Sequence, residues 1–188
     1  MSALPIEEIT RRYKARPFSE AQLPALLALC RGNPLYYAHM KTQPSLESLR
    51  GDLPALPPGT ELQDKHFFGL YRGDALAAAV DLIVGYRAPG EAYLGWFILA
   101  EELQGRGEGT RIVQEILAFL RGRGISVLRL ARVQGNPQSK RFWEKNGFYP
   151  NGLVVEREGY AVVEMERDDP PGRPVSHASG GKIFRLFR

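Results

Sequence analysis

The segment that decides the fold is YLGWFILAEELQGRGEGTRIVQEILAFLRGRGISVLRL, residues 93–130. Its opening, residues 93–99, is aromatic and β-branched enough for a buried strand. A glycine-rich loop follows, and then a helix whose apolar residues recur at helical spacing until Gly122 and Gly124 end it. Residues 125–130 predict the next strand. A strand, a loop, a helix and a strand in this order make a right-handed βαβ crossover with parallel strands.

Upstream of this segment, the sequence predicts an antiparallel meander. Apolar runs at 66–71 and 75–84 flank Arg72-Gly73-Asp74, which has the length and glycine content of a hairpin turn. Pro89-Gly90 marks a second turn before residue 93. The N-terminal part is predicted to be helical, with one helix over 19–32 and a short one near 45–53, followed by a rigid proline-rich loop at 54–59.

Downstream, the sequence predicts one more helix and two closing strands. Asn136 can cap a helix that has Pro137 at its first position and Gly147 just past its end. Strands follow at 148–154 and 160–166. We therefore expect an α/β fold in which helices flank a mixed sheet, as a single domain over residues 1–167. Residues 168–188 form a Pro/Gly-rich tail with a basic, aromatic end, either mobile or docked on a groove or partner subunit.

Composition excludes several classes of protein. The chain has 188 residues and one cysteine, Cys30, so it has no disulfide framework or cysteine-based zinc cluster. Its three histidines are far apart, and we expect no metal site. No apolar run approaches the ~20 residues of a membrane span, and MSALPIEEIT has no signal-peptide character, so we expect a cytoplasmic protein. The net charge of +4 would serve a nucleic acid or a small anionic cofactor equally well, so charge alone does not choose between them. Because the charge is spread along the chain and forms no concentrated basic stripe, we expect nucleic acid to be the less favoured partner.

The loop between the first strand and the helix has the chemistry of a phosphate site. Glycines 105, 107 and 109 precede or open a helix, whose first N–H groups and positive dipole end attract phosphate oxygens. Glu108-Gly109-Thr110 lacks the lysine of a P-loop. The spacing is G-x-G-x-G and no acid lies in 125–130, so a dinucleotide fold does not fit either. Taken alone, the loop has a less favoured alternative, a tight turn that binds nothing.

Two motifs together resemble those of the GNAT superfamily of N-acetyltransferases. The tract Gln104-Gly-Arg-Gly-Glu-Gly109 is similar to the family's pyrophosphate loop, and Asn136-Pro-Gln-Ser-Lys-Arg-Phe-Trp-Glu-Lys-Asn-Gly-Phe148 is similar to its second motif. The resemblance covers about residues 66–166. It implies a six- to seven-stranded mixed sheet, splayed between the fourth and fifth strands, and acetyl-CoA as the cofactor.

The resemblance also implies which residues bind acetyl-CoA. Gly105 through Thr110 would surround the pyrophosphate, the main chain of 97–99 would pair with the pantetheine arm, and Asn136 would hold the pantetheine or the thioester end. The implied cofactor-binding residues are Phe97, Ile98, Leu99, Gln104, Gly105, Arg106, Gly107, Glu108, Gly109, Thr110, Asn136, Ser139, Phe142 and Trp143.

The catalytic positions depart from the family pattern. Tyr93 stands where many members have a glutamate base, and Trp143 stands where many have a tyrosine acid; an indole cannot protonate a thiolate. We assign catalytic roles to Tyr93 and Asn136, and we expect a water held by Tyr93, Asp81 or Glu91 to serve as base. Packing in the core is the alternative reading of Tyr93 and Trp143.

The acceptor site in this superfamily usually involves the N-terminal helices and the loop between them. The residues expected to bind the acceptor are therefore Tyr36, Tyr37 and Asp81. For the two tyrosines the alternative is packing of their loop onto the sheet, and for Asp81 it is a solvent-facing position.

The sequence thus predicts an acetyl-CoA-dependent N-acetyltransferase. It would act on a primary amine of a small molecule or peptide, by direct attack in a ternary complex. The alternative is a CoA-binding sensor or scaffold that has lost catalysis. Transfer to an RNA-borne or ribosomal amine is a third reading, which the pI and the tail suggest, and a homodimer stays open.

Overall fold

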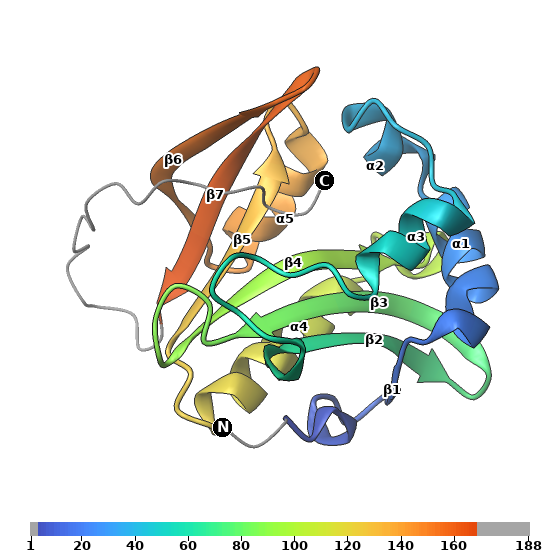
Figure 1. The fold of residues 1–188 in the computed structure, drawn as a ribbon, viewed down its shortest axis with the longest axis horizontal. Helices are drawn as coiled ribbons and strands as arrows, with labels where there is room; N and C mark the ends of the chain where they lie inside the picture. Colours follow the sequence, from blue (N-terminus) through green and yellow to red (C-terminus); the bar gives the residue numbers. More distant parts are fainter. Residues whose placement is uncertain (1–3, 169–188) are drawn as a thin grey trace.

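A computed structural model describes residues 4–168 (Figure 1), so the predicted tail lies outside the described residues apart from Asp168. The centre is a seven-stranded mixed sheet with strand order β1-β2-β3-β4-β5-β7-β6. Its strands are β1 (Lys14–Pro17), β2 (Lys65–Arg72), β3 (Ala75–Val84), β4 (Glu91–Leu99), β5 (Val127–Val133), β6 (Tyr149–Arg157) and β7 (Tyr160–Asp168). The helices are α1 (Leu23–Arg31), α2 (Pro34–His39), α3 (Leu46–Asp52), α4 (Glu108–Arg121) and α5 (Pro137–Lys145). The predicted mixed α/β class is confirmed.

The two faces of the sheet carry separate cores. Successive side chains of a strand point to opposite faces, so Phe68 packs in a cluster with Ile116 of α4, while its neighbour Phe67 packs in another with Leu26 of α1 and Leu49 of α3. Helices on both faces therefore fix the central strands. None of the helices in the described range is long and apolar enough to cross a membrane.

The parallel pair β4–β5 is short, as the predicted splay requires. Its register runs only from Glu91↔Val127 to Leu94↔Leu130, after which the strands part. β5 continues beside β7 as far as Val133, so β5, β7 and β6 form a wing that diverges from β1–β4 (Figure 1). Beyond Leu94, β4 therefore has no strand on its β5 side.

A β-bulge lies where the strands begin to part. Asp81 of β3 pairs with Trp96, and Leu82 pairs with Leu94, so Gly95 is an extra residue in β4. A bulge turns the side chains that follow it and bends the strand. This shift places Trp96 in the core cluster on the α1 face, although Leu94 belongs to the cluster on the α4 face.

Three expectations about the elements are wrong. The N-terminal part is not wholly helical, because Lys14–Pro17 pairs with β2 as an edge strand; a charged stretch that ends in proline carries no alternating apolar pattern. The expected acceptor loop contains helix α2, which Pro34 opens. The fifth strand runs over Val127–Val133, later than predicted, because Ile125 is buried in the turn after α4.

Candidate functional site

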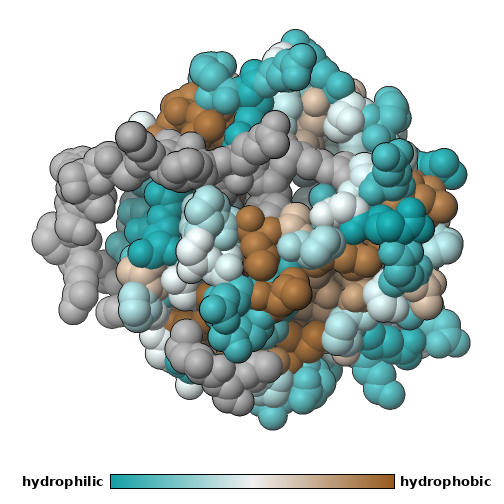
Figure 2. Space-filling model, viewed as in Figure 1, coloured by the Kyte–Doolittle hydropathy of each residue, from teal (hydrophilic) through white to brown (hydrophobic). Residues whose placement is uncertain are grey.

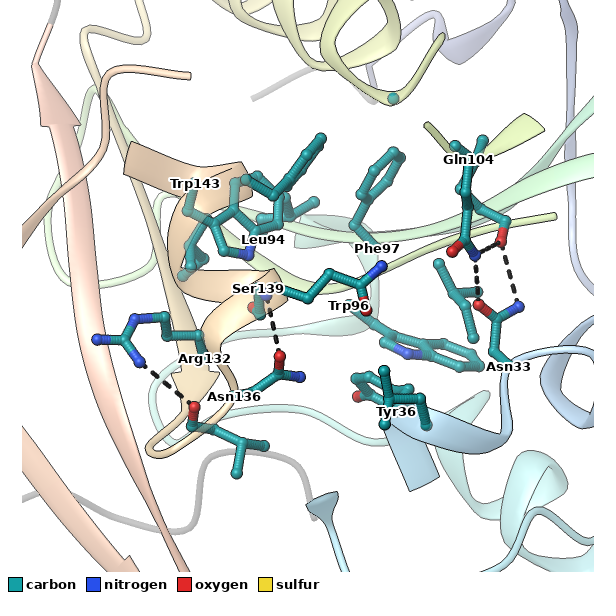
Figure 3. A pocket seen from close by; sticks show the side chains of 18 of the residues that line it. Asn33, Tyr36, Leu94, Trp96, Phe97, Gln104, Arg132, Asn136, Ser139 and Trp143 are labelled. Carbon is teal, nitrogen blue, oxygen red and sulfur yellow. Dashed lines mark hydrogen bonds between the residues drawn. The ribbon is translucent and has the colours of Figure 1, made fainter. Parts of the chain in front are cut away.

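A cavity of about 520 Å³ opens where β4 and β5 part (Figure 3). Its walls come from α2 and the residues before it, β4 and the loop after it, β5, α5, and the β6–β7 hairpin. Apolar residues gather near the middle of the face seen in Figure 2. The volume of the cavity is in the range of small-molecule binding sites, and the cavity combines an apolar lining with polar groups that converge on it.

One end of the cavity is the glycine loop, which we call the donor end. Gly105 and Gly107 have φ angles of +71° and +78°, in the left-handed region that favours glycine. Both line the cavity, together with Gly109 and Thr110. Gly107 is the N-cap of α4, so the unpaired N–H groups of the first turn lie at this end. This main-chain cradle fits the pyrophosphate of a coenzyme.

The third glycine of the loop has a packing role. A Cβ on Gly109 would lie 3.1 Å from the Phe142 ring and 3.4 Å from Leu99, whereas one on Gly105 or Gly107 would meet nothing within 4 Å. Gly105 and Gly107 are thus required for their conformation, and Gly109 allows α4 to approach α5 and β4 closely.

Two predicted residues of the loop keep their side chains out of the cavity. The Glu108 carboxylate accepts hydrogen bonds from Tyr13 Oη at 2.8 Å and Arg111 Nη1 at 2.9 Å. The hydrogen bond from Tyr13 and the neighbouring arginines lower the pKa of Glu108. Glu108 therefore joins the start of α4 to the N-terminal segment. Arg106 is exposed, and its side chain does not line the cavity.

The end of β4 is tied to the residue before α2. The Leu99 carbonyl accepts hydrogen bonds from Gln104 Nε2 at 3.0 Å and from Asn33 Nδ2 at 3.1 Å. Gln104 Nε2 also donates to Asn33 Oδ1 at 2.7 Å (Figure 3). The Leu99 carbonyl already has two donors, and the hydrogen bond from Ala100 N–H to the Ala77 carbonyl shows that the even-numbered residues at this end of β4 turn their main chain toward β3. Phe97 is therefore the better main-chain partner for an extended ligand, and the expected pairing through Ile98 does not fit this register. Sequence reasoning missed Asn33.

Helix α5 supplies an amide and an aromatic wall. Asn136 Oδ1 accepts from the Ser139 N–H at 3.0 Å and so caps α5, which leaves its amide NH₂ as the group that can donate to a ligand. The Phe97 ring lies 6.1 Å from Phe142 and 6.0 Å from Trp143. Trp143 lines the cavity and is also part of the core.

The three groups expected to hold a catalytic water lie in different surroundings. Tyr93 lines the cavity, but its hydroxyl has no hydrogen-bond partner among the described residues. Burial raises its pKa far above the usual range, so the hydroxyl stays protonated. Glu91 forms an ion pair with Arg129 at the paired end of β4. Of the three groups, only Asp81 is both ionisable near neutral pH and close to the bulge.

The opposite end, which we call the acceptor end, contains a second cavity of about 40 Å³. The structure brings the predicted acceptor residues together there. The lining residues are Tyr36, Tyr37, Met40, Thr42, Asp52, Asp81, Gly95 and Trp96. Four of them, Tyr36, Met40, Gly95 and Trp96, also line the large cavity, so the two cavities are adjacent.

Asp81 is the buried charge of this end. Its Oδ2 accepts a hydrogen bond from Lys65 Nζ at 2.6 Å, and both side chains are almost fully buried. Burial raises the pKa of Asp81 to about 6, although the Lys65 ammonium opposes this shift. Neither Lys65 nor Trp96 was predicted. The glycine inside the apolar run of β4 was the available signal for a bulge.

Further unpredicted residues of the large cavity come from the wing. Arg132, Arg157 and Tyr160 line it on the side of β5 and the β6–β7 hairpin. Within residues 4–168, no cluster of side chains is suited to hold a metal ion, and no histidine of that range lines either cavity.

Comparisons with known proteins agree with this geometry. The family model for the GNAT acetyltransferases matches residues 33–148, more than half of the chain. No curated protein matches.

Among solved structures, an acetyltransferase from Thermus thermophilus is 24% identical, with 89% of this chain and 99% of that chain covered and a TM-score of 0.66. The ribosomal-protein-S18-alanine N-acetyltransferase from Escherichia coli is 16% identical, with 92% and 99% covered and a TM-score of 0.60. The PaiA N-acetyltransferase from Thermoplasma acidophilum, solved with coenzyme A, is 21% identical, with 83% and 98% covered and a TM-score of 0.59. At these identities the likeness shows the fold.

Proposed function

This chain belongs to the GNAT acetyltransferase family, whose cofactor is acetyl-CoA, and from that premise we propose that it acetylates a primary amine of a small molecule or peptide by direct attack in a ternary complex. The observation that carries this proposal is the connection between the two ends of the cleft. A main-chain phosphate cradle lies at one end, and a cavity with a buried carboxylate adjoins the other.

The residues of the chain divide the work between binding and positioning. The first turn of α4 would hold the pyrophosphate, and the amide of Asn136 would orient the acyl end. When bound, acetyl-CoA supplies the thioester carbonyl that the amine attacks. The main chain beside the Gly95 bulge, unpaired on its β5 side, is available to donate to that carbonyl oxygen.

Direct attack is favoured over a covalent acetyl-enzyme. Cys30 of α1 is fully buried in the core and lines neither cavity. Ser139 lines the large cavity, but no histidine of the described residues lies there to activate it. The C–N bond would therefore form as the C–S bond breaks, with the thiolate leaving and the proton of the amine passing to a water in the large cavity.

Calorimetric titration with acetyl-CoA, with NADPH as a control, tests the donor half of the proposal. We expect micromolar binding of acetyl-CoA and none of NADPH. Release of free thiol, followed with a panel of amines and short peptides, tests the transfer. Binding without turnover on any amine would favour the CoA-binding sensor or scaffold instead.

A further inference from the structure

Charged side chains lie at the small cavity of the acceptor end. Two carboxylates line it, Asp81 of β3 and Asp52 of α3, and one ammonium, Lys65 of β2, is bonded to Asp81 from beside it. Helix α2 lines the cavity with Tyr36 and Tyr37, while its His39 is not among the lining residues. A positively charged donor makes a stronger hydrogen bond to a carboxylate than a neutral donor does, and it would share Asp81 with Lys65.

Two polar atoms of this cavity lack a partner. Asp81 is 5% exposed, and its Oδ1 makes no hydrogen bond with any described residue, although Oδ2 is bonded to Lys65. The indole Nε1 of Trp96, the residue opposite Asp81 in the register, is also buried without a partner among the described residues. Leaving such groups unpaired is costly. Asp81 Oδ1 therefore needs a ligand that donates a hydrogen bond, whereas the indole N–H, which can only donate, needs an acceptor such as a water.

The position of Asp81 relates the small cavity to the proposed reaction. A Cβ on Gly95 would lie 3.4 Å from Asp81 Oδ2, so the carboxylate lies against the bulge. Gly95 and Trp96 form part of the wall of both cavities. A group bound at Asp81 Oδ1 is therefore next to the part of β4 that faces the large cavity.

Resting on the proposed function, we propose that Asp81 is the specificity residue of the acceptor site, and that the acceptor is a primary ammonium on an unbranched, uncharged carbon stem. The ammonium donates to Oδ1, the aromatic and methionine side chains of the shared wall cover the stem, and the rest of the molecule occupies the large cavity. Ammonium groups are also attracted to aromatic faces.

Cavity size and charge exclude other acceptors. A volume of 40 Å³ holds on the order of three water-sized groups by the measure in which one water needs ~10–15 Å³. An α-carboxylate beside the amine would add bulk and bring a negative charge toward Asp52 and Asp81. Free α-amino acids are thus rejected, whereas arylalkylamines, alkylamines and lysine-like side chains are accepted.

Direct binding can be measured without acetyl-CoA. The chain has two tryptophans, so its ¹H–¹⁵N spectrum has two indole signals, which a Trp143→Phe variant assigns. We expect 2-phenylethylamine to shift the Trp96 indole signal, and 2-phenylethanol and phenylalanine, which have a similar shape, to bind at least 30-fold more weakly. Equal binding of the neutral alcohol, or tighter binding of phenylalanine, would overturn the proposal.

Two single substitutions test whether Asp81 is the residue that binds the ammonium. Asp81→Asn should weaken binding of 2-phenylethylamine and lower kcat/KM for it by about 100-fold, as truncation of a buried charge partner does, with the affinity for acetyl-CoA unchanged. Asp74→Asn is the matched control, because it removes the same charge from the exposed β2–β3 turn.

Loss of Asp81 alone leaves Lys65 buried without its partner, which is destabilising. The double variant Lys65→Gln with Asp81→Asn therefore serves as a second test, because it replaces the ion pair with neutral amides. It should fold and still fail to distinguish 2-phenylethylamine from 2-phenylethanol. Retained discrimination in this folded variant would refute the role of Asp81.

The two proposals fail in different ways. If acetyl-CoA does not bind, the proposed function fails, while the Asp81-dependent shift of the Trp96 signal still stands or falls by itself. If acetyl-CoA binds and amines are acetylated with no preference for an unbranched ammonium, the specificity proposal alone is wrong.

Discussion

The donor end and the acceptor end present different kinds of chemical group to a ligand. The donor end is main chain, made of left-handed glycines and the first N–H groups of α4, and it comes from one continuous stretch of sequence. The acceptor end is side chains, brought together from β2, β3, β4, α2, the segment after it, and α3. A main-chain site recognises a group common to many ligands, whereas a side-chain site can change its ligand through single substitutions.

The largest expected effect tests the donor end. Gly107→Val forces a β-branched residue into φ +78° at the N-cap of α4, at a strain of ~1–3 kcal/mol, and distorts the cradle. We expect affinity for acetyl-CoA to fall by about 100-fold, measured by calorimetry.

Gly124→Val is the matched control for strain. Gly124 has φ +77° and, like Gly107, open space around its Cβ, but it lies in the turn after α4 and does not line the large cavity. It should lower the Tm without weakening acetyl-CoA binding. Equal loss of affinity in both variants would mean that the loop acts only through stability.

The second prediction concerns pH at the acceptor end. Because burial raises the pKa of Asp81 to about 6, the carboxylate is lost as pH falls through 6, whereas an alkylamine stays protonated. Affinity for 2-phenylethylamine should drop about tenfold from pH 7 to pH 5. The charged groups that face Asp81 are Lys65 and Asp52, with neutral Tyr36 and Tyr37. A profile in Asp81→Asn as steep as in the wild type would contradict this assignment.

The raised pKa of Asp81 makes the pH dependence of stability opposite to that of amine binding. The folded state holds the Asp81 proton more tightly than the unfolded state, whose pKa is near 3.8. The contribution of this group to the free energy of unfolding is therefore fully present below pH ~4 and is lost as pH rises to about 6. Binding and stability thus favour opposite protonation states.

A smaller effect is expected at Asn136, whose side chain lies outside the donor end and would orient the acyl end of the cofactor. Asn136→Ala removes the cap of α5 and should cost ~1 kcal/mol of stability, together with a roughly fivefold loss of acetyl-CoA affinity. Ser45→Ala is the control, because Ser45 caps α3 through the same kind of bond to Ser48 N–H, at 3.0 Å. Its affinity for acetyl-CoA should not change. Unchanged affinity in Asn136→Ala would leave Asn136 with a structural role only.

The smallest effect should appear at both the donor end and the acceptor end. Asn33 joins the start of α2 to Leu99 and Gln104, so Asn33→Ala should raise KM for both acetyl-CoA and the amine by about threefold, the value of one neutral hydrogen bond. Asn33→Asp keeps the acceptor for Gln104 but not the donor to Leu99. Steady-state kinetics that change for only one substrate would show that the two ends are independent.

The contrast between the ends also explains what could be predicted from the sequence. Gly105 and Gly107 are visible because a main-chain site needs particular backbone angles, and only glycine adopts them freely. The splayed sheet followed from the family resemblance. Lys65 and Asn33 could not be found, because their roles depend on partners 16 and 66 residues away, which no local pattern encodes. Asp81 was found as a carboxylate in an apolar strand, but its partner was not.

The four-residue pairing of β4 with β5 has a mechanical consequence. Few ladder hydrogen bonds join the wing of β5, β7 and β6 to the rest of the sheet, so the wing is the unit that can detach below the cost of global unfolding. Its amides should exchange with solvent sooner than those of β2 and β3. A ligand bound in the large cavity contacts both the wing and β4. Binding should therefore stabilise the attachment of the wing and protect its amides from exchange and its chain from proteolysis.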